Sequence, residues 1–266
     1  MGVEWSSTYF FLFFLSLFIT VIFCLIHGLA DRDEGWADRQ PLMTMPITIA
    51  VVQLKGGTGR STVATNLAGA LATLPGASAV LVDGDLPQGT SSAWFAAREK
   101  LIVGRWGAEW WARINKITLA PVANHRELTA QVRRHADASF VVLDAPPRTA
   151  EMTRAMLLLA DVVLVPCGPS LPELWATQDL LPVLEDVPHK PVVRLVWTRV
   201  RGGVGLSDEL TGTAAKQLGI TPLKTRLALR VTYAECLGDG QTVAEAGNRA
   251  AREELTALVR EVRRLV

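Results

Sequence analysis

A glycine-rich loop is the clearest chemical feature of this 266-residue sequence. The stretch LKGGTGRST, residues 54–62, follows an apolar run typical of a strand and opens a pattern typical of a helix. Gly56, Gly57 and Gly59 can adopt backbone angles that other residues avoid, so that amide groups can face an anion. The N-terminus of the following helix adds positive potential. The stretch predicts a phosphate-binding loop, and a glycine-rich turn without ligand is the alternative.

The polar residues of this loop complete the prediction of a nucleotide site. Ser61 stands where a hydroxyl binds Mg²⁺, and Thr62 stands where a hydroxyl reaches a phosphate. Arg60 occupies the position at which such loops normally carry lysine. Arginine keeps the positive charge, but its planar guanidinium is bulkier than an ammonium group, so we expect ATP binding with slow hydrolysis. The expected phosphate-binding residues are Gly56, Gly57, Thr58, Gly59, Arg60, Ser61 and Thr62.

The loop belongs to a repeating alternation of short apolar runs and helical patterns. The predicted strands are ITIAVVQ, SAVLVD, FVVLD, DVVLVP and PVVRLVW. Continuous apolar runs of this kind are typical of strands that are buried on both faces. With helices between them, they predict an α/β, P-loop NTPase-like fold with a mostly parallel twisted sheet and helices on both faces. Ligands of such sheets bind beyond the carboxyl ends of the strands, where the loop lies.

A lysine near the start of the loop identifies its type. Leu54 replaces the first glycine of the common G-x-x-x-x-G-K-[ST] pattern, but the loop matches the variant K-G-G-x-G-K-[ST]-T, in which Lys55 is the early lysine. Here the chain resembles the ParA/MinD superfamily of deviant Walker A ATPases, and its short length resembles the small, ParF-like ParA proteins of plasmid partition. The resemblance covers residues 45–266. It implies a homodimer with ATP and Mg²⁺, in which Lys55 is a catalytic residue that reaches the partner's nucleotide.

Acidic residues at two other strand ends resemble further motifs of this superfamily. Asp83 and Asp85 lie in VLVDGDLPQG, which resembles the D-x-D-P-Q segment, although Leu86 separates Asp85 from the proline. FVVLDAPP resembles a Walker B strand that ends in Asp144. Carboxylates beside a phosphate loop can hold Mg²⁺ or orient the attacking water. A helix cap or a turn is the alternative for a single acidic residue. The expected metal ligands are Ser61, Asp83 and Asp144, and the expected catalytic residues are Lys55, Asp85 and Arg60.

The rest of the resemblance implies a base site and a set of partners. The segment WTR implies that Thr198 and Arg199 lie near the adenine base. The function implied is an ATP-dependent dimer switch in plasmid or chromosome partition. Such a dimer binds DNA non-specifically, and a small ParB- or ParG-like centromere-binding protein stimulates its release. Alternatives are a membrane-tethered, MinD-like positioning ATPase, a nucleotide-binding scaffold that does not hydrolyse ATP, and an ATP-dependent amide ligase of the same fold.

The C-terminal residues combine an apolar stripe with basic residues. In NRAAREELTALVREVRRLV the apolar residues recur at helical spacing, so we expect a helix packed on the sheet domain. Clustered positive charge is all that non-specific contacts to DNA phosphates require. The candidate DNA-contacting residues are Arg252, Arg260, Arg263 and Arg264, together with Lys224, Arg226 and Arg230. For the tryptophans around residues 94–111, we expect buried packing.

The first 44 residues differ in composition from the remainder. Residues 9–26 carry no charge and hold six of the chain's eight phenylalanines, and a run of this length can span a bilayer as a helix. We therefore expect an extension over residues 1–44 ahead of an ATPase domain at 45–266. One interpretation is that the extension is an inner-membrane anchor, with the ATPase domain in the cytoplasm. The other is that translation starts at Met45, so that the first 44 residues are an upstream artefact. In the second case we expect a cytoplasmic, nucleoid-associated protein.

Composition adds two limits. The chain has three cysteines without metal-ligand spacing, which is typical of a reduced compartment and excludes a disulfide scaffold. The formal net charge is +1, so overall charge alone does not indicate a nucleic-acid-binding protein.

Overall fold

The computed structural model describes residues 45–86, 88–147, 150–201 and 216–266. The apolar run at residues 9–26 lies outside these ranges, so its role as a membrane anchor stays a prediction. Within the described residues, no helix is long and apolar enough to cross a membrane.

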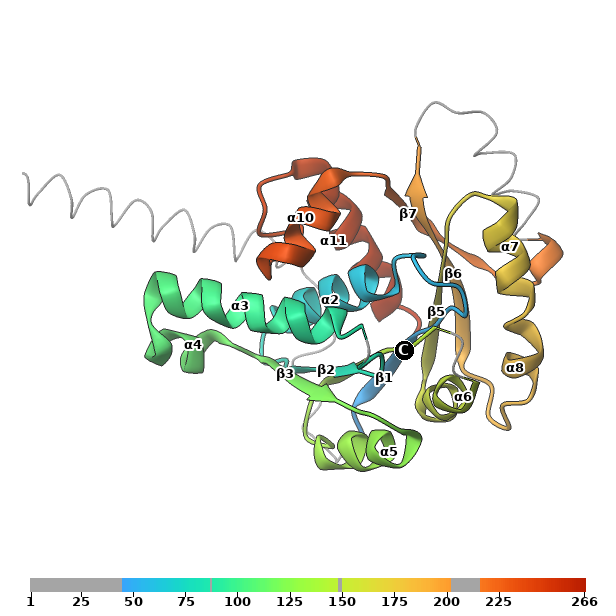
Figure 1. Ribbon diagram of the computed structural model, residues 1–266, viewed down its shortest axis with the longest axis horizontal. Helices are drawn as coiled ribbons and strands as arrows, with labels where there is room; N and C mark the ends of the chain where they lie inside the picture. Colours follow the sequence, from blue (N-terminus) through green and yellow to red (C-terminus); the bar gives the residue numbers. More distant parts are fainter. Residues whose placement is uncertain (1–44, 87, 148–149, 202–215) are drawn as a thin grey trace, which may run out of the picture. The chain divides into compact units, whose positions relative to one another are not determined.

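One parallel sheet organises the described residues. Its seven strands lie in the order β3-β2-β4-β1-β5-β6-β7, and every neighbouring pair is parallel (Figure 1). The strands are β1 (Ile47–Val51), β2 (Ala79–Asp83), β3 (Ile117–Pro121), β4 (Phe140–Asp144), β5 (Val162–Cys167), β6 (Val192–Val200) and β7 (Pro222–Ala228). The predicted α/β fold with a parallel sheet is confirmed, with β1 and its following loop near the middle.

Helices cover both faces of this sheet. They are α2 (Arg60–Leu71), α3 (Thr90–Trp106), α4 (Ala108–Ile114), α5 (His125–Arg134), α6 (Ala150–Leu159), α7 (Leu171–Gln178), α8 (Leu181–Glu185), α10 (Val231–Asp239) and α11 (Arg249–Arg263). Residues of α2, α3, α10 and α11 share one apolar core, and residues of α5, α6 and α7 share the other (Figure 1). Successive strand residues alternate between the two cores, as in β1, where Ile49 and Val51 face one core and Ala50 faces the other.

The five predicted strands are all present, whereas sequence periodicity missed β3 and β7. These two strands form the edges of the sheet, and both contain exposed residues, which alternate with buried ones in β7. Lys224 and Arg226 of β7 are exposed, so no continuous apolar run marks that strand. The edge strands therefore lack the pattern of a strand buried on both faces.

The C-terminal helix and Trp94 are both packed in the apolar core on one face of the sheet. Helix α11 buries Leu255, Leu258 and Val262 against the sheet domain, which confirms the expected C-terminal helix. Trp94 is fully buried and its indole N–H donates to the Gln241 carbonyl oxygen at 2.9 Å, which confirms the packing role. Trp106 departs from the expectation, because half of its surface is exposed.

Candidate functional site

The loop between β1 and α2 has the backbone shape of an anion cradle. Gly57 and Gly59 have φ angles of 76° and 93°, in the left-handed region that side chains disfavour. Gly59 is also the N-cap of α2, and no described side chain caps the amides of this helix terminus. Those amides are therefore available to a bound anion, at the end of the helix where the dipole favours negative charge.

This loop forms one wall of a cavity of about 500 Å³, a size suited to a nucleotide. The loop residues that line the cavity are Gly56, Gly57, Thr58, Gly59, Arg60, Ser61 and Thr62. Asp85, Thr198 and Arg199 line it as well. The fold thus brings together all of the residues expected to bind phosphate and the two expected to lie near the base. Three expected site residues do not line the cavity: Lys55, Asp83 and Asp144.

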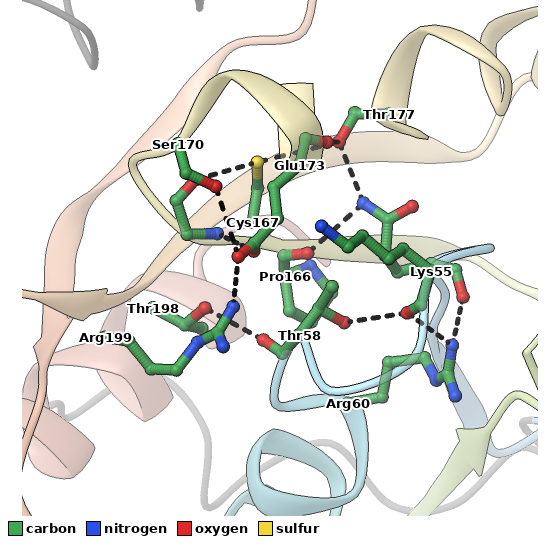
Figure 2. A network of polar contacts seen from close by, with 12 residues as sticks. Lys55, Thr58, Arg60, Pro166, Cys167, Ser170, Glu173, Thr177, Thr198 and Arg199 are labelled. Carbon is green, nitrogen blue, oxygen red and sulfur yellow. Dashed lines mark hydrogen bonds and ion pairs between the residues drawn. The ribbon is translucent and has the colours of Figure 1, made fainter. Parts of the chain in front are cut away.

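Arg60 is buried and folds back onto the start of its own loop. Its Nη1 donates hydrogen bonds to the carbonyl oxygens of Gln53 and Lys55, the latter at 3.1 Å (Figure 2). Its Nε is buried and has no hydrogen-bond partner among the described residues. Burial lowers the pKa of Arg60, and the nearby carboxylates of Asp144 and Asp85 act in the opposite direction. The guanidinium therefore closes the loop and places a positive charge beside the acidic residues.

Asp83 and Asp144 are neighbours at the ends of β2 and β4, where they are register partners. Both oxygens of Asp83 are used within the protein: Oδ1 accepts from the Asp85 amide at 3.0 Å, and Oδ2 accepts from the amide and hydroxyl of Ser92 at 2.8 and 2.6 Å. Asp83 thus ties the acidic loop to the first turn of α3. This is the capping role that was the alternative for a strand-end aspartate.

Asp144 differs from Asp83, because one of its two carboxylate oxygens accepts no hydrogen bond from the described residues. Its Oδ2 accepts a hydrogen bond from the Ser91 hydroxyl at 2.7 Å, while its buried Oδ1 has no hydrogen-bond partner among the described residues. Burial raises the pKa of Asp144 to about 6, a rise that the hydroxyls of Ser91 and Ser61 moderate. A buried carboxylate oxygen without a partner is costly unless a ligand completes it.

These residues fit Mg²⁺ bound together with a nucleotide. Asp144 offers the unpaired oxygen, and the Ser61 hydroxyl lies close enough to influence its pKa. In the described part of the chain, no cluster of three or more His, Cys, Asp or Glu side chains could hold a metal ion by itself. Phosphate oxygens would therefore have to supply further ligands, as is usual for Mg²⁺. Asp83 stays a predicted ligand, and its hydrogen bonds connect the acidic loop to α3.

Thr198 and Arg199 lie near the end of β6 and contact two different elements. The Thr198 hydroxyl donates to the Thr58 carbonyl oxygen at 2.9 Å, and Arg199 pairs with the carboxylate of Glu173 at the start of α7 (Figure 2). Arg199 has a φ of 54° and is the one described non-glycine residue with a positive φ. Thr198 therefore fixes the phosphate loop to β6, and Arg199 fixes β6 to α7.

The far wall of the cavity was missed by sequence reasoning. It consists of residues from the end of β7 and from α10: Leu227, Ala228, Leu229, Arg230, Tyr233, Ala234 and Leu237. The only sequence signal was the segment LALRVTYAEC, part of the family resemblance without any assigned role. Arg230 was expected as a candidate DNA contact, but it lines this cavity and pairs with Glu254.

Replacing Thr198 by valine tests the link between the loop and β6. We expect Thr198→Val to weaken Mg-ATP binding by about threefold to tenfold, because the Thr58 carbonyl loses a hydrogen bond that is worth roughly 1 kcal/mol. Isothermal titration calorimetry measures the change, and thermal unfolding monitors stability. An unchanged dissociation constant would show that Thr198 does not help to shape the loop.

The fold and the site define a P-loop nucleotide-binding ATPase domain. The model of the family described as ATPase MipZ matches residues 47–181, just over half of the chain, and the chain belongs to this family of ParA/MinD-type ATPases.

Individual relatives agree with this assignment. The chain is 27% identical over 226 residues to the maintenance of carboxysome distribution protein A of Halothiobacillus neapolitanus, covering 81% of this chain and 95% of the relative. It is 28% identical over 218 residues to the chromosome-partitioning ATPase Soj of Thermus thermophilus, covering 74% and 87%. Its fold matches the septum site-determining protein MinD of Pyrococcus horikoshii complexed with Mg-ADP, with a TM-score of 0.64, 18% identity and coverage of 83% and 97%. The predicted ParA/MinD superfamily is confirmed. These relatives are carboxysome-distribution and chromosome-partitioning proteins, so they do not support the expected similarity to plasmid ParF.

Proposed function

We propose that this protein is a positioning ATPase, in which Mg-ATP switches the chain between a monomer and a homodimer that helps to distribute a cellular cargo. The observation that carries the proposal is the phosphate loop facing a nucleotide-sized cavity, with the unpaired oxygen of Asp144 behind it. The names of the relatives support the cargo-positioning part, because they concern carboxysome distribution and chromosome partitioning.

Each residue has a distinct part in this proposal. The amides of the loop and of the first turn of α2 bind the phosphates, and Asp144 and Ser61 hold the metal side of the site. Mg²⁺, when bound, neutralises charge on the phosphate oxygens. Asp85 lines the cavity and is the candidate for orienting the attacking water. Burial raises the pKa of Asp85, and the charge of Arg60 opposes that rise.

Arg60 is the residue that sets the rate in this proposal. Its Nη1 is already engaged by two loop carbonyls, so it is not free to follow charge that develops on the transferred phosphate. A donor helps catalysis most when it is aimed at the position where charge develops. We therefore propose that ATP binds well and is hydrolysed slowly, as suits a switch.

Lys55 provides the test of the dimer. Its side chain does not line the cavity of its own chain, so we propose that it completes the nucleotide site of a second copy. We expect Lys55→Ala to weaken ATP-dependent dimerisation by at least about tenfold, since removing one partner of a buried charge pair typically costs 2 kcal/mol or more. Analytical ultracentrifugation with Mg-ATP and with Mg-ADP measures the effect. Lys224→Ala, at an exposed lysine of β7, is the matched control. Dimers of Lys55→Ala as stable as those of the wild type would exclude this role.

The dimer is further proposed to bind DNA non-specifically and to be released by a small ParB- or ParG-like partner. Exposed arginines on α11 and at its C-cap support a phosphate-binding face, namely Arg252, Arg260 and Arg264. Association with the nucleoid in the cytoplasm follows from this proposal. A steep fall of DNA affinity with salt would support it, and equal affinity with ATP and with ADP would count against a switch.

A membrane-tethered positioning ATPase is the second candidate. The observation in its favour is the charge-free run at residues 9–26, which has the length of a bilayer-spanning helix. Carbonate extraction of membranes from cells that express the full chain distinguishes the two candidates. An extractable protein would remove this second candidate.

A further inference from the structure

The far wall of the cavity is held by one carboxylate of the C-terminal helix. Glu254 of α11 accepts hydrogen bonds from Arg230 Nε at 2.9 Å, from Arg230 Nη2 at 2.7 Å and from the Tyr233 hydroxyl at 2.8 Å. It also accepts from the amide of Ala228, the last residue of β7, at 3.2 Å. Ala228, Arg230 and Tyr233 all line the cavity, whereas Glu254 does not. Glu254 thus links the end of β7 to the start of α10 through hydrogen bonds, without lining the cavity itself.

The contacts of Glu254 are sheltered from solvent. Its side chain is 15% exposed, so its ion pair with Arg230 is screened less than an ordinary surface pair. Burial and the neighbouring Glu254 raise the pKa of Tyr233, so the phenol stays protonated and remains a donor. Glu253, the adjacent residue, is different: it pairs with Arg249 on the surface, where the two side chains are 64% and 91% exposed.

This arrangement determines what the wall presents to the cavity. Both Nε and Nη2 of Arg230 point to Glu254, which orients the planar guanidinium and leaves Nη1 outside the ion pair. The other side chains of the wall are mainly apolar, among them Leu227, Ala234 and Leu237. An oriented planar cation on an apolar surface is suited to contact a flat heterocycle. The phosphate loop lines the same cavity.

We propose that Glu254 is a positioning residue for nucleobase recognition, which fixes Arg230 and Tyr233 as the wall against which the base of the nucleotide packs. The inference rests on the proposed Mg-ATP site and adds to it a contribution from the C-terminal helix. It requires that Glu254 affect binding of the base and leave binding of the triphosphate unchanged.

Two probes separate these effects: Mg-ATP and Mg-tripolyphosphate, which carries the phosphates without a base. In Glu254→Gln the side-chain NH₂ cannot accept the hydrogen bonds that the carboxylate accepts, so we expect the dissociation constant of Mg-ATP to rise about tenfold. Tyr233→Phe keeps the ring and removes one hydrogen bond, so a rise of about threefold is expected. For both variants the affinity for Mg-tripolyphosphate should change by less than about twofold.

Glu253→Gln is the matched control, because it changes the neighbouring glutamate without touching the cavity, and it should leave both affinities unchanged. Isothermal titration calorimetry on the full chain gives the dissociation constants, and thermal unfolding verifies that each variant is folded. Equal losses for both probes in Glu254→Gln and Tyr233→Phe would show a general structural effect and overturn the inference. Unchanged Mg-ATP affinity would overturn it as well. If the wild type bound neither probe, the proposed function would fail, and the inference with it.

Discussion

Asp144→Asn is expected to abolish Mg²⁺-dependent ATP hydrolysis while making the ligand-free protein more stable. The variant removes the carboxylate whose Oδ1 has no hydrogen-bond partner among the described residues. Without this carboxylate the site no longer holds Mg²⁺ in place. The turnover rate should therefore fall about 1000-fold, in line with the several kcal/mol that metal ions contribute to such reactions. Steady-state phosphate release with saturating Mg-ATP measures the loss.

The gain in stability has a separate cause. Burial raises the pKa of Asp144 to about 6 from its ordinary value of 3.8, so ionisation of this carboxyl group opposes folding at neutral pH. Asparagine has no charge to bury, and the free energy of unfolding at pH 7 should rise by about 1–3 kcal/mol. Asp186→Asn is the control, because Asp186 forms a mostly exposed pair with Arg154. An Asp144→Asn variant with undiminished turnover, or with lower stability than the wild type, would contradict the assignment.

The same pKa predicts a pH dependence with a definite sign. The folded state holds the proton of Asp144 more tightly than the unfolded state does, because its pKa is raised. The stability that this proton confers is present below about pH 4 and is lost as the pH rises through about 6. Mg²⁺ binding needs the carboxylate and should run in the opposite direction, so the affinity for Mg²⁺ should fall as the pH drops below about 6.

Arg60→Ala is expected to weaken Mg-ATP binding by about 100-fold. The substitution removes the charge beside Asp144 and Asp85 and leaves the carbonyl oxygens of Gln53 and Lys55 without their donor. Each buried acceptor left without a partner costs about 1–3 kcal/mol, which distorts the loop, and the lost positive charge weakens the attraction for the phosphates further. Calorimetric titration of Mg-ATP into the full chain measures this change.

Arg60→Lys is the matched variant, because it keeps the charge and restores the usual residue of such loops. It should retain ATP affinity within about threefold and raise the turnover rate about tenfold, because a flexible ammonium group can follow the transferred phosphate. If Arg60→Lys hydrolysed ATP no faster than the wild type, Arg60 would not be what limits the rate. ATP binding by Arg60→Ala at wild-type affinity would remove Arg60 from the site altogether.

The features that could be predicted from sequence are those encoded by contiguous residues. The central strands are apolar runs, and the phosphate loop carries its glycines and hydroxyls within nine residues, so both are visible without any tertiary information. The ends of parallel strands meet at one edge, which is why Asp83 and Asp144 could be placed near the loop. The edge strand β7 could not be predicted, because exposed Lys224 and Arg226 interrupt its apolar positions.

What escaped prediction depends on partners that are distant in the sequence. Asp83 and Asp144 end similar strands. Both oxygens of Asp83 accept hydrogen bonds, whereas Oδ1 of Asp144 accepts none from the described residues. In the sequence Arg230 resembles any surface arginine, but in the structure it pairs with Glu254, 24 residues later, and lines the cavity. These contacts depend on how α3 and α11 pack against the rest of the domain, and no local sequence pattern specifies that packing.

In the proposed switch, Mg-ATP binds at this loop and drives dimerisation with slow turnover. The most direct test follows phosphate release and sedimentation of the full chain together, with Mg-ATP, with Mg-ADP, and with ATP in the presence of EDTA. The proposed switch predicts a dimer only with Mg-ATP, slow phosphate release that requires Mg²⁺, and loss of both in Asp144→Asn. A chain that stays in one association state with every nucleotide and releases no phosphate would contradict it.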